Sequence, residues 1–188
     1  TVEWLGTVSC DALLLLEADA APELPSRGVS DLYLCDFLGT FDAGPGSEAF
    51  ATWATRMRAE LRAVAVRLYD RLGQDAEWRG AWADALQLGE RVVGIEPIFE
   101  EGHRRIMRAW AAKGERGLAL VHYQRFAAGL SEEFGASPDD RTERLAAKMR
   151  QDDAHANRAI RQPGGSFGED MTASTPLGRT AGTPARPF

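Results

Sequence analysis

The chain has 188 residues, of which 44% are hydrophobic and 27% charged, as is ordinary for a soluble globular protein. Its formal net charge of −6 argues against a segment that grips a nucleic-acid backbone by itself, because such binding depends on clustered Lys and Arg. Two cysteines, Cys10 and Cys35, do not make a disulfide framework, and no apolar run is long enough to span a membrane, so we expect a cytoplasmic protein.

The first forty residues predict three short elements. Val2–Val8 is the only plausible strand of the chain. Asp11 can cap a short helix over Ala12–Ala18, because its carboxylate can accept a free N–H of the first turn. A second short helix is expected over Ser30–Leu38.

A long helical pattern follows. We expect Ser47 to cap it, and Gly80 to end it unless Gly73 stops it earlier. One continuous apolar stripe runs along it at steps of three and four residues, formed by Phe50, Trp53, Met57, Leu61, Val64, Leu68 and Leu72.

Four further helices are expected after Gly80. The first covers Trp82–Val93, and the next two carry the apolar stripes Phe99–Trp110 and Leu118–Phe134. The last begins at Ser137 and Pro138, a residue type that caps followed by one that suits the first helical position, and frays toward Arg161. The sequence therefore predicts an all-α fold of about seven helices.

Two stretches of the helical part repeat each other at a spacing of thirty-four residues. The matching pairs are Leu72 and Ile106, Ala76 and Trp110, Gly80 and Gly114, Ala85 and Ala119, and Leu86 and Leu120. In each stretch a glycine turns the corner, and an alanine one turn into the next helix allows close approach. This period is that of tetratricopeptide repeats, whose stacked helical hairpins build binding and assembly surfaces.

The end of the chain has a different composition. Residues 162–188 are rich in Gly, Pro, Ser and Thr and have no apolar periodicity, so they cannot offset their ordering entropy and are predicted to be a disordered linker. The helical domain is then expected over residues 11–161, and residues 1–10 as the end of, or the linker from, a preceding domain.

Four blocks together resemble the bacterial transcriptional activator domain, the helical module of Streptomyces antibiotic regulatory proteins and related large regulators. The blocks are LYLCDFLGTF (Leu32–Phe41), EAFATWATRMRAELR (Glu48–Arg62), EPIFEEGHRRIMRAWAAKGERGLALVHYQRF (Glu96–Phe126) and EEFGASPDDRTERL (Glu132–Leu145). The resemblance covers about residues 11–150. It implies a tetratricopeptide-like fold and a preceding winged-helix domain, absent from this sequence, that would bind the DNA.

Candidate chemical motifs are weak. Glu100-x-x-His103 has the carboxylate–histidine spacing of di-iron bundles, but only Asp152-x-x-His155 is remotely similar to it, and such a site needs more carboxylates. His103 shares a stripe with Phe99 and Ile106, so we expect it to pack between helices. No nucleophile, zinc or phosphate-loop motif accompanies the histidines, and we predict neither catalysis nor a cofactor.

Four residues are candidates for contact with a protein partner. Trp78 lies beside the Gly80 turn, and its burial is not evident from the pattern. The other candidates are Arg104, Arg105 and Arg108; the alternative is that these arginines form a solvated helix face with local ion pairs. The remaining tryptophans on apolar stripes, expected to lie mostly in the core, are Trp53, Trp82 and Trp110.

These observations predict a regulatory or oligomerisation module of a bacterial transcriptional regulator. Its expected partners are other proteins: a second copy, RNA polymerase or adjacent domains of the same regulator. DNA would be bound only through the preceding domain, and no membrane is involved. The alternative is a tetratricopeptide-type scaffold for protein assembly without a link to transcription.

Overall fold

The computed structural model describes residues 10–24, 28, 31–39 and 48–161, and side chains only as far as residue 152. Within these ranges the fold is all-α, as predicted, with no strand. The helices are α1 (Asp11–Ala20), α2 (Glu48–Trp78), α3 (Trp82–Ile95), α4 (Glu100–Ala112), α5 (Arg116–Phe134) and α6 (Asp140–Arg161). The predicted strand Val2–Val8, the predicted Ser47 cap and the predicted linker 162–188 lie outside the described residues.

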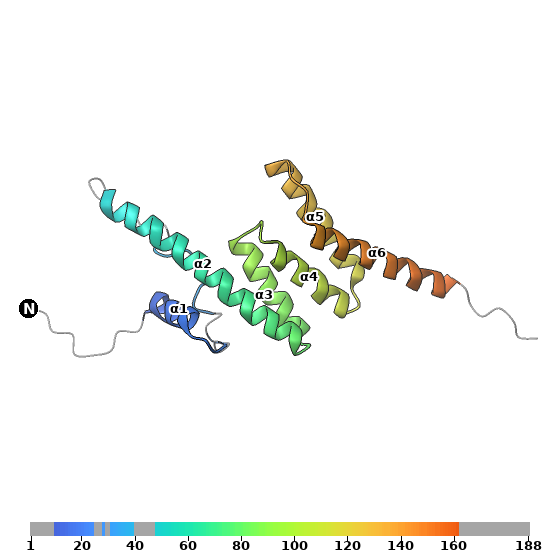
Figure 1. Cartoon of the computed structure of the whole chain (residues 1–188), viewed down its shortest axis with the longest axis horizontal. Helices are drawn as coiled ribbons and strands as arrows, with labels where there is room; N and C mark the ends of the chain where they lie inside the picture. Colours follow the sequence, from blue (N-terminus) through green and yellow to red (C-terminus); the bar gives the residue numbers. More distant parts are fainter. Residues whose placement is uncertain (1–9, 25–27, 29–30, 40–47, 162–188) are drawn as a thin grey trace, which may run out of the picture.

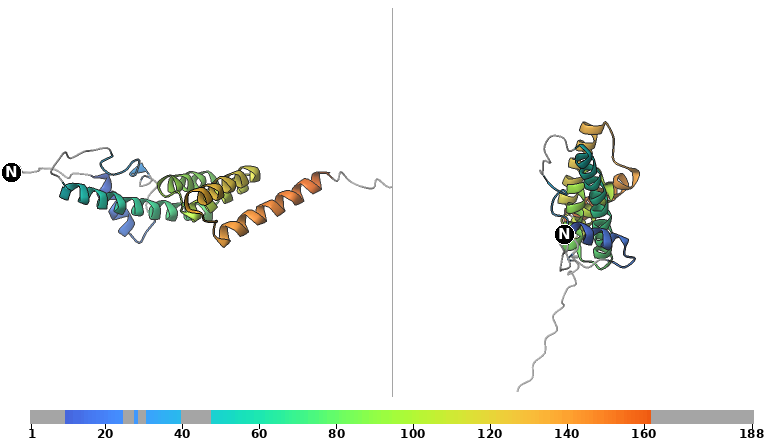
Figure 2. Two further views of the ribbon diagram at one scale, coloured as in Figure 1. Left: turned by 90° about the horizontal axis from the view of Figure 1, so that it is seen from above. Right: turned by 90° about the vertical axis from the view of Figure 1, so that its left-hand side faces the viewer.

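The helices stack as two antiparallel hairpins, α2–α3 and α4–α5, with α6 laid against the second hairpin (Figure 1). The N-terminal half of α2 extends beyond α3 (Figure 1). α1 packs near the middle of α2, where Arg67 pairs with Asp19, and residues 31–39 lie along the same helix. Figure 2 shows the resulting elongated shape, with α2 and α6 reaching in opposite directions from the stacked hairpins.

The two hairpin corners have the same backbone geometry. The Ala81 N–H donates to the Ala76 carbonyl at 2.8 Å, and the Glu115 N–H donates to the Trp110 carbonyl at 2.9 Å, one repeat later. Gly80 and Gly114 have φ angles of 71° and 86°, in the left-handed region that favours glycine. The thirty-four-residue repeat seen in the sequence is therefore a structural repeat.

The core consists of apolar side chains at the contacts between successive helices. Ala85 and Ala119, the equivalent alanines of α3 and α5, are both fully buried. The N-terminal part of the core joins α1, α2 and Val92 of α3, and residues 31–39 pack on it. The C-terminal part joins Met107 of α4 to α5 and α6.

Residues 31–39 do not form the second short helix that the sequence predicts, so the described residues contain six helices. They run as turns, and Leu38 and Gly39 have positive φ angles of 63° and 44°. Side chains from α2 fix this path: Arg62 pairs with Asp36, and Arg58 donates to the Phe37 carbonyl at 2.8 Å. Tertiary contacts thus override a weak helical pattern.

Two predicted helix starts need correction. Asp11 is the first residue of α1 and not its cap; its carboxylate accepts the Ala12 N–H at 2.8 Å. α6 begins at Asp140, so neither Ser137 nor Pro138 has the predicted role. Its capping side chain is Asp139, which accepts the Thr142 N–H at 2.7 Å.

Gly73 does not end α2, which continues to Trp78. A Cβ at this position would lie 2.5 Å from Nε of Arg105 on α4. Gly73 is therefore the place where a guanidinium from the second hairpin packs flat on the first.

Candidate functional site: a charged network across α2, α4 and α6

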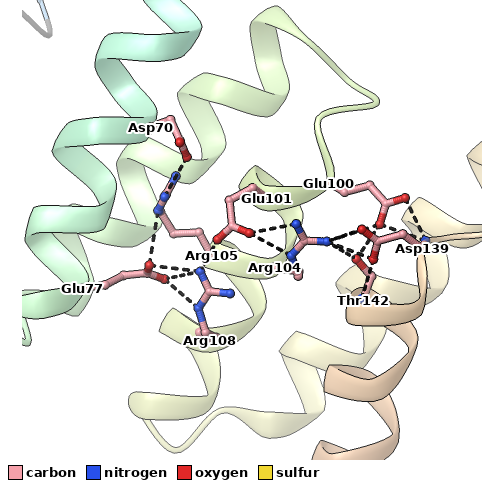
Figure 3. A network of polar contacts seen from close by, with 9 residues as sticks. All are labelled: Asp70, Glu77, Glu100, Glu101, Arg104, Arg105, Arg108, Asp139 and Thr142. Atoms are coloured by element: carbon pink, nitrogen blue, oxygen red, sulfur yellow. Dashed lines mark hydrogen bonds and ion pairs between the residues drawn. The ribbon is translucent and has the colours of Figure 1, made fainter.

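The three predicted contact arginines of α4 form the centre of a row of ion pairs. Figure 3 shows the row, which runs from α2 through α4 to the start of α6. Its carboxylates are Asp70, Glu77, Glu100, Glu101 and Asp139, and its guanidiniums are Arg104, Arg105 and Arg108. Five carboxylates against three guanidiniums leave the row with an excess of negative charge.

Arg104 fastens α6 to α4. One of its terminal nitrogens donates to Asp139 at 2.8 Å and to the Thr142 hydroxyl at 2.9 Å, and another pairs with Glu101 at 2.8 Å. The Asp139 N–H donates to Glu100 at 2.8 Å, and the buried Thr142 hydroxyl donates to the same carboxylate. Burial opposes ionisation of Asp139, but hydrogen bonds from Thr142 and the Arg104 guanidinium hold its pKa well below the usual range.

Arg105 fastens α4 to α2 and is 1% exposed. It donates to Asp70 at 2.8 Å, and its Nε lies 3.7 Å from Glu77. Nε and Nη1 are buried and have no hydrogen-bond acceptor among the described residues. The guanidinium is thus held by charge and by packing on Gly73 more than by complete hydrogen bonding.

Arg108 completes the row at its more accessible edge, where its side chain is 32% exposed. It binds both oxygens of Glu77, at 2.9 and 3.0 Å, and one oxygen of Glu101 at 2.6 Å. Burial tends to raise the pKa of Glu101, but Arg108 and Arg104 lower it below its ordinary value. Glu77 and Glu101 therefore each bridge two arginines.

The row differs from the solvated helix face that was the alternative interpretation of these arginines. Arg104 and Arg105 are both buried: Arg104 pairs with Asp139 as well as with two carboxylates of its own helix, and Arg105 pairs with Asp70 of α2. Trp78 is 86% exposed and projects from the end of α2. Binding of a partner by these four residues stays a prediction, and the structure gives Trp78 the most accessible position among them.

Of the three tryptophans expected to lie mostly in the core, Trp82 and Trp110 are half-buried and Trp53 is 46% exposed. Trp53 packs its ring against Phe37 and Phe50 at the edge of α2. The apolar stripe continues beyond the part of α2 that α3 covers, so a stripe position there does not ensure burial.

A pair of histidines joins α4 to α5. Nδ1 of His103 lies 2.9 Å from Nε2 of His122, and Nε2 of His103 lies 2.8 Å from the Pro97 carbonyl oxygen. The His103 ring stacks on Phe126 with 3.8 Å between ring centroids, which confirms that it packs between helices. Burial lowers the pKa of His103, and burial with the neighbouring His103 and Arg125 charges lowers that of His122 to about 4.

Beside this pair lies a hollow of about 320 Å³. Ile98 and Phe134, 47% and 59% exposed, flank it, and Arg125, Gly129 and Glu133 of α5 line it. Apart from His103, the sequence did not single out the residues of this surface as a site. Only a comparison of the two repeats, position by position, would have marked them.

The motif Glu100-x-x-His103 does not converge on a common point. Glu100 binds Asp139 and Thr142, whereas His103 binds His122 and Pro97. No group of three or more possible metal ligands occurs among the residues whose side chains are described. The searched helices also include none with the length and apolar character required to cross a membrane.

The described residues form two stacked helical hairpins followed by a further helix, and ion pairs between elements hold them together. This arrangement defines a helical-repeat module. Residues 20–150 match the family described as the bacterial transcriptional activator domain. The chain belongs to this family, as its sequence blocks suggested, and the domain is a regulatory module of the transcription-activator type. No curated protein and no solved structure matches the chain.

Proposed function

We propose that this domain regulates transcription through contacts with other proteins, while a winged-helix domain preceding it in the full regulator binds the promoter. The family supports a role in transcriptional activation. The net charge of −6 supports a role away from the DNA, and we expect the chain alone to bind random duplex only weakly even at low salt. A cytoplasmic location belongs to this proposal.

One observation carries the protein-contact role: an aromatic side chain exposed on a rigid support. Trp78 is 86% exposed, whereas the equivalent position of the second hairpin holds Ala112, so the corner itself does not require a large side chain. Interface energy concentrates in a few aromatic and arginine residues. The charged row fixes α2 to α4, which keeps Trp78 in one orientation for a partner such as a second copy, RNA polymerase or an adjacent domain.

The test is a bacterial reporter in which the chain is fused to a DNA-binding domain of known operator. We expect Trp78→Ala to lower reporter activation, or self-association measured by sedimentation, without changing the melting temperature of the chain. Trp53→Ala is the control, because it removes ring packing against Phe37 and should lower the melting temperature instead.

Two results would decide against this proposal. Unchanged activation and unchanged association in the Trp78→Ala variant would remove Trp78 as an anchor. Self-association without any activation from the wild-type fusion would favour an assembly scaffold with no link to transcription.

A further inference from the structure

The two hairpins have equivalent surfaces, and the described residues cover the first more completely than the second. The surface lies at the end of each hairpin away from the glycine corners. In the first hairpin it is formed by Tyr69, Leu88, Arg91, Val92 and Ile95, and the residues one repeat later are His103, His122, Arg125, Phe126 and Gly129.

In the first hairpin a non-helical segment of the chain, residues 31–39, covers this surface. The Tyr69 hydroxyl donates to the Tyr33 carbonyl at 3.0 Å. Arg91 pairs with Asp31 at 3.0 Å, and Leu32, Tyr33 and Phe37 pack on the same core cluster as Leu88 and Ile95. Within the molecule, this surface therefore binds a segment in which an acidic residue is followed by apolar and aromatic side chains.

In the second hairpin the equivalent surface is covered only in part: His103 and Phe126 are buried, but His122 and Gly129 are half-buried and Arg125 is exposed. The hollow of about 320 Å³ lies there, at the lower end of the range for ligand pockets. A hollow of about 450 Å³ also lies at the first hairpin, but there residues 33–36 line it together with Arg91 and Ile95. A Cβ on Gly129 would meet nothing within 4 Å, so the position of the Ile95 side chain is open in the second hairpin. Arg125 is exposed, and the structure shows no carboxylate of the described residues paired with it as Asp31 is with Arg91.

We propose that this hollow binds an extended segment of a partner polypeptide in which an acidic residue is followed by apolar and aromatic side chains. The acidic residue pairs with Arg125, and the apolar side chains enter the hollow between Ile98, Phe126 and Phe134. Glu133 lies two helical turns from Arg125 and repels a second carboxylate there, which gives the bound segment a direction. This inference rests on the protein-contact role proposed above and names the chemistry of the partner.

The probe is the segment that the chain itself uses. A fluorescently labelled peptide with the sequence of residues 30–38 and Cys35→Ser is titrated with the full 188-residue chain, and fluorescence anisotropy is recorded. We expect saturable binding with a Kd on the order of tens of micromolar, as suits a short peptide that must be ordered on binding. The same peptide with Asp31→Lys should bind at least about fivefold more weakly.

Protein variants locate the binding site. Arg125→Glu should weaken binding of the original peptide at least about fivefold and restore binding of the Asp31→Lys peptide. Gly129→Phe fills the hollow and should abolish binding. Arg141→Glu, a reversal of an exposed charge on α6, is the matched control and should leave binding unchanged. Melting temperatures establish that each variant is folded.

Three outcomes would overturn the inference: no saturable binding up to about 1 mM peptide, undiminished binding to a folded Gly129→Phe variant, or equal effects of Arg125→Glu and Arg141→Glu. Undiminished binding to Gly129→Phe would mean that the peptide displaces residues 31–39 from the first hairpin. The reporter assay separates these failures from failure of the proposed function, because wild-type activation would persist while the peptide site is lost.

Discussion

The first and second hairpins share a backbone but use equivalent polar positions differently. Arg71 of α2 lies at the edge of the stack and donates to the Glu23 carbonyl at 2.9 Å. Its equivalent, Arg105 of α4, is 1% exposed between helices and faces Asp70 and Glu77. The repeat therefore determines corners and helix contacts, while each residue's place in the stack determines whether its charge is a surface contact or part of the interior.

The largest effect that this comparison predicts is on Arg105. We expect Arg105→Ala to destabilise the domain by about 3 kcal/mol, because Asp70 would lose its cation and the space beside Gly73 that the buried guanidinium fills would be left empty. Arg71→Ala at the equivalent position should cost about 1 kcal/mol or less. Chemical unfolding of both variants measures the difference. Equal losses in the free energy of unfolding would mean that the interior position of Arg105 adds no stability beyond that of Arg71.

The next effect concerns the equivalent alanines, where the two hairpins should behave alike. Ala85→Leu and Ala119→Leu should each destabilise by roughly 1–3 kcal/mol, since both side chains are fully buried where paired helices meet. Thermal or chemical unfolding checks this. A neutral result in one hairpin only would show that the packing, unlike the backbone, does not repeat.

A smaller effect depends on pH and belongs to the second hairpin alone. His122 has a pKa of about 4 in the folded chain, below its ordinary value of 6.5, so the unfolded state binds more protons between these values. Stability should therefore fall as pH is lowered from 7 toward 4, and the melting temperature should fall with it. His122→Leu places the side chain of the equivalent Leu88 there and should reduce this pH dependence; an unchanged pH profile would contradict the assignment.

The smallest effect is expected outside both hairpins. A chain that ends at Arg161 should keep its melting temperature within about 1 °C, because the composition of residues 162–188 supports no core. Calorimetry on the shortened and full chains tests this. Loss of folding in the shortened chain would show that the predicted linker is structural.

Local patterns were sufficient to predict most of the fold. Apolar stripes identified the five helices from α2 onward, and the glycine–alanine spacing identified the two corners and the buried Ala85 and Ala119. The non-helical path of residues 31–39 could not be inferred locally, because Arg58 and Arg62 of a distant helix fix it.

The charged row could not be predicted for a related reason. Arg104, Arg105 and Arg108 lie among polar residues and resemble a solvated face until their partners are known. Asp70 precedes Arg105 by 35 residues and Asp139 follows Arg104 by the same number, so each pair spans about one repeat. Gly73 was the one indication of this row in the sequence, because a glycine inside an otherwise strong helix often marks a close approach by another group.

The unbroken course of α2 through Gly73 has a mechanical consequence. This helix of 31 residues is about 46 Å long, and α1, residues 31–39 and α3 all pack along it. Its only glycine lies against the Arg105 guanidinium, which clamps the helix where it would otherwise bend most easily. A force applied near Glu48 is therefore transmitted along an unbent helix to the Gly80 corner beside Trp78.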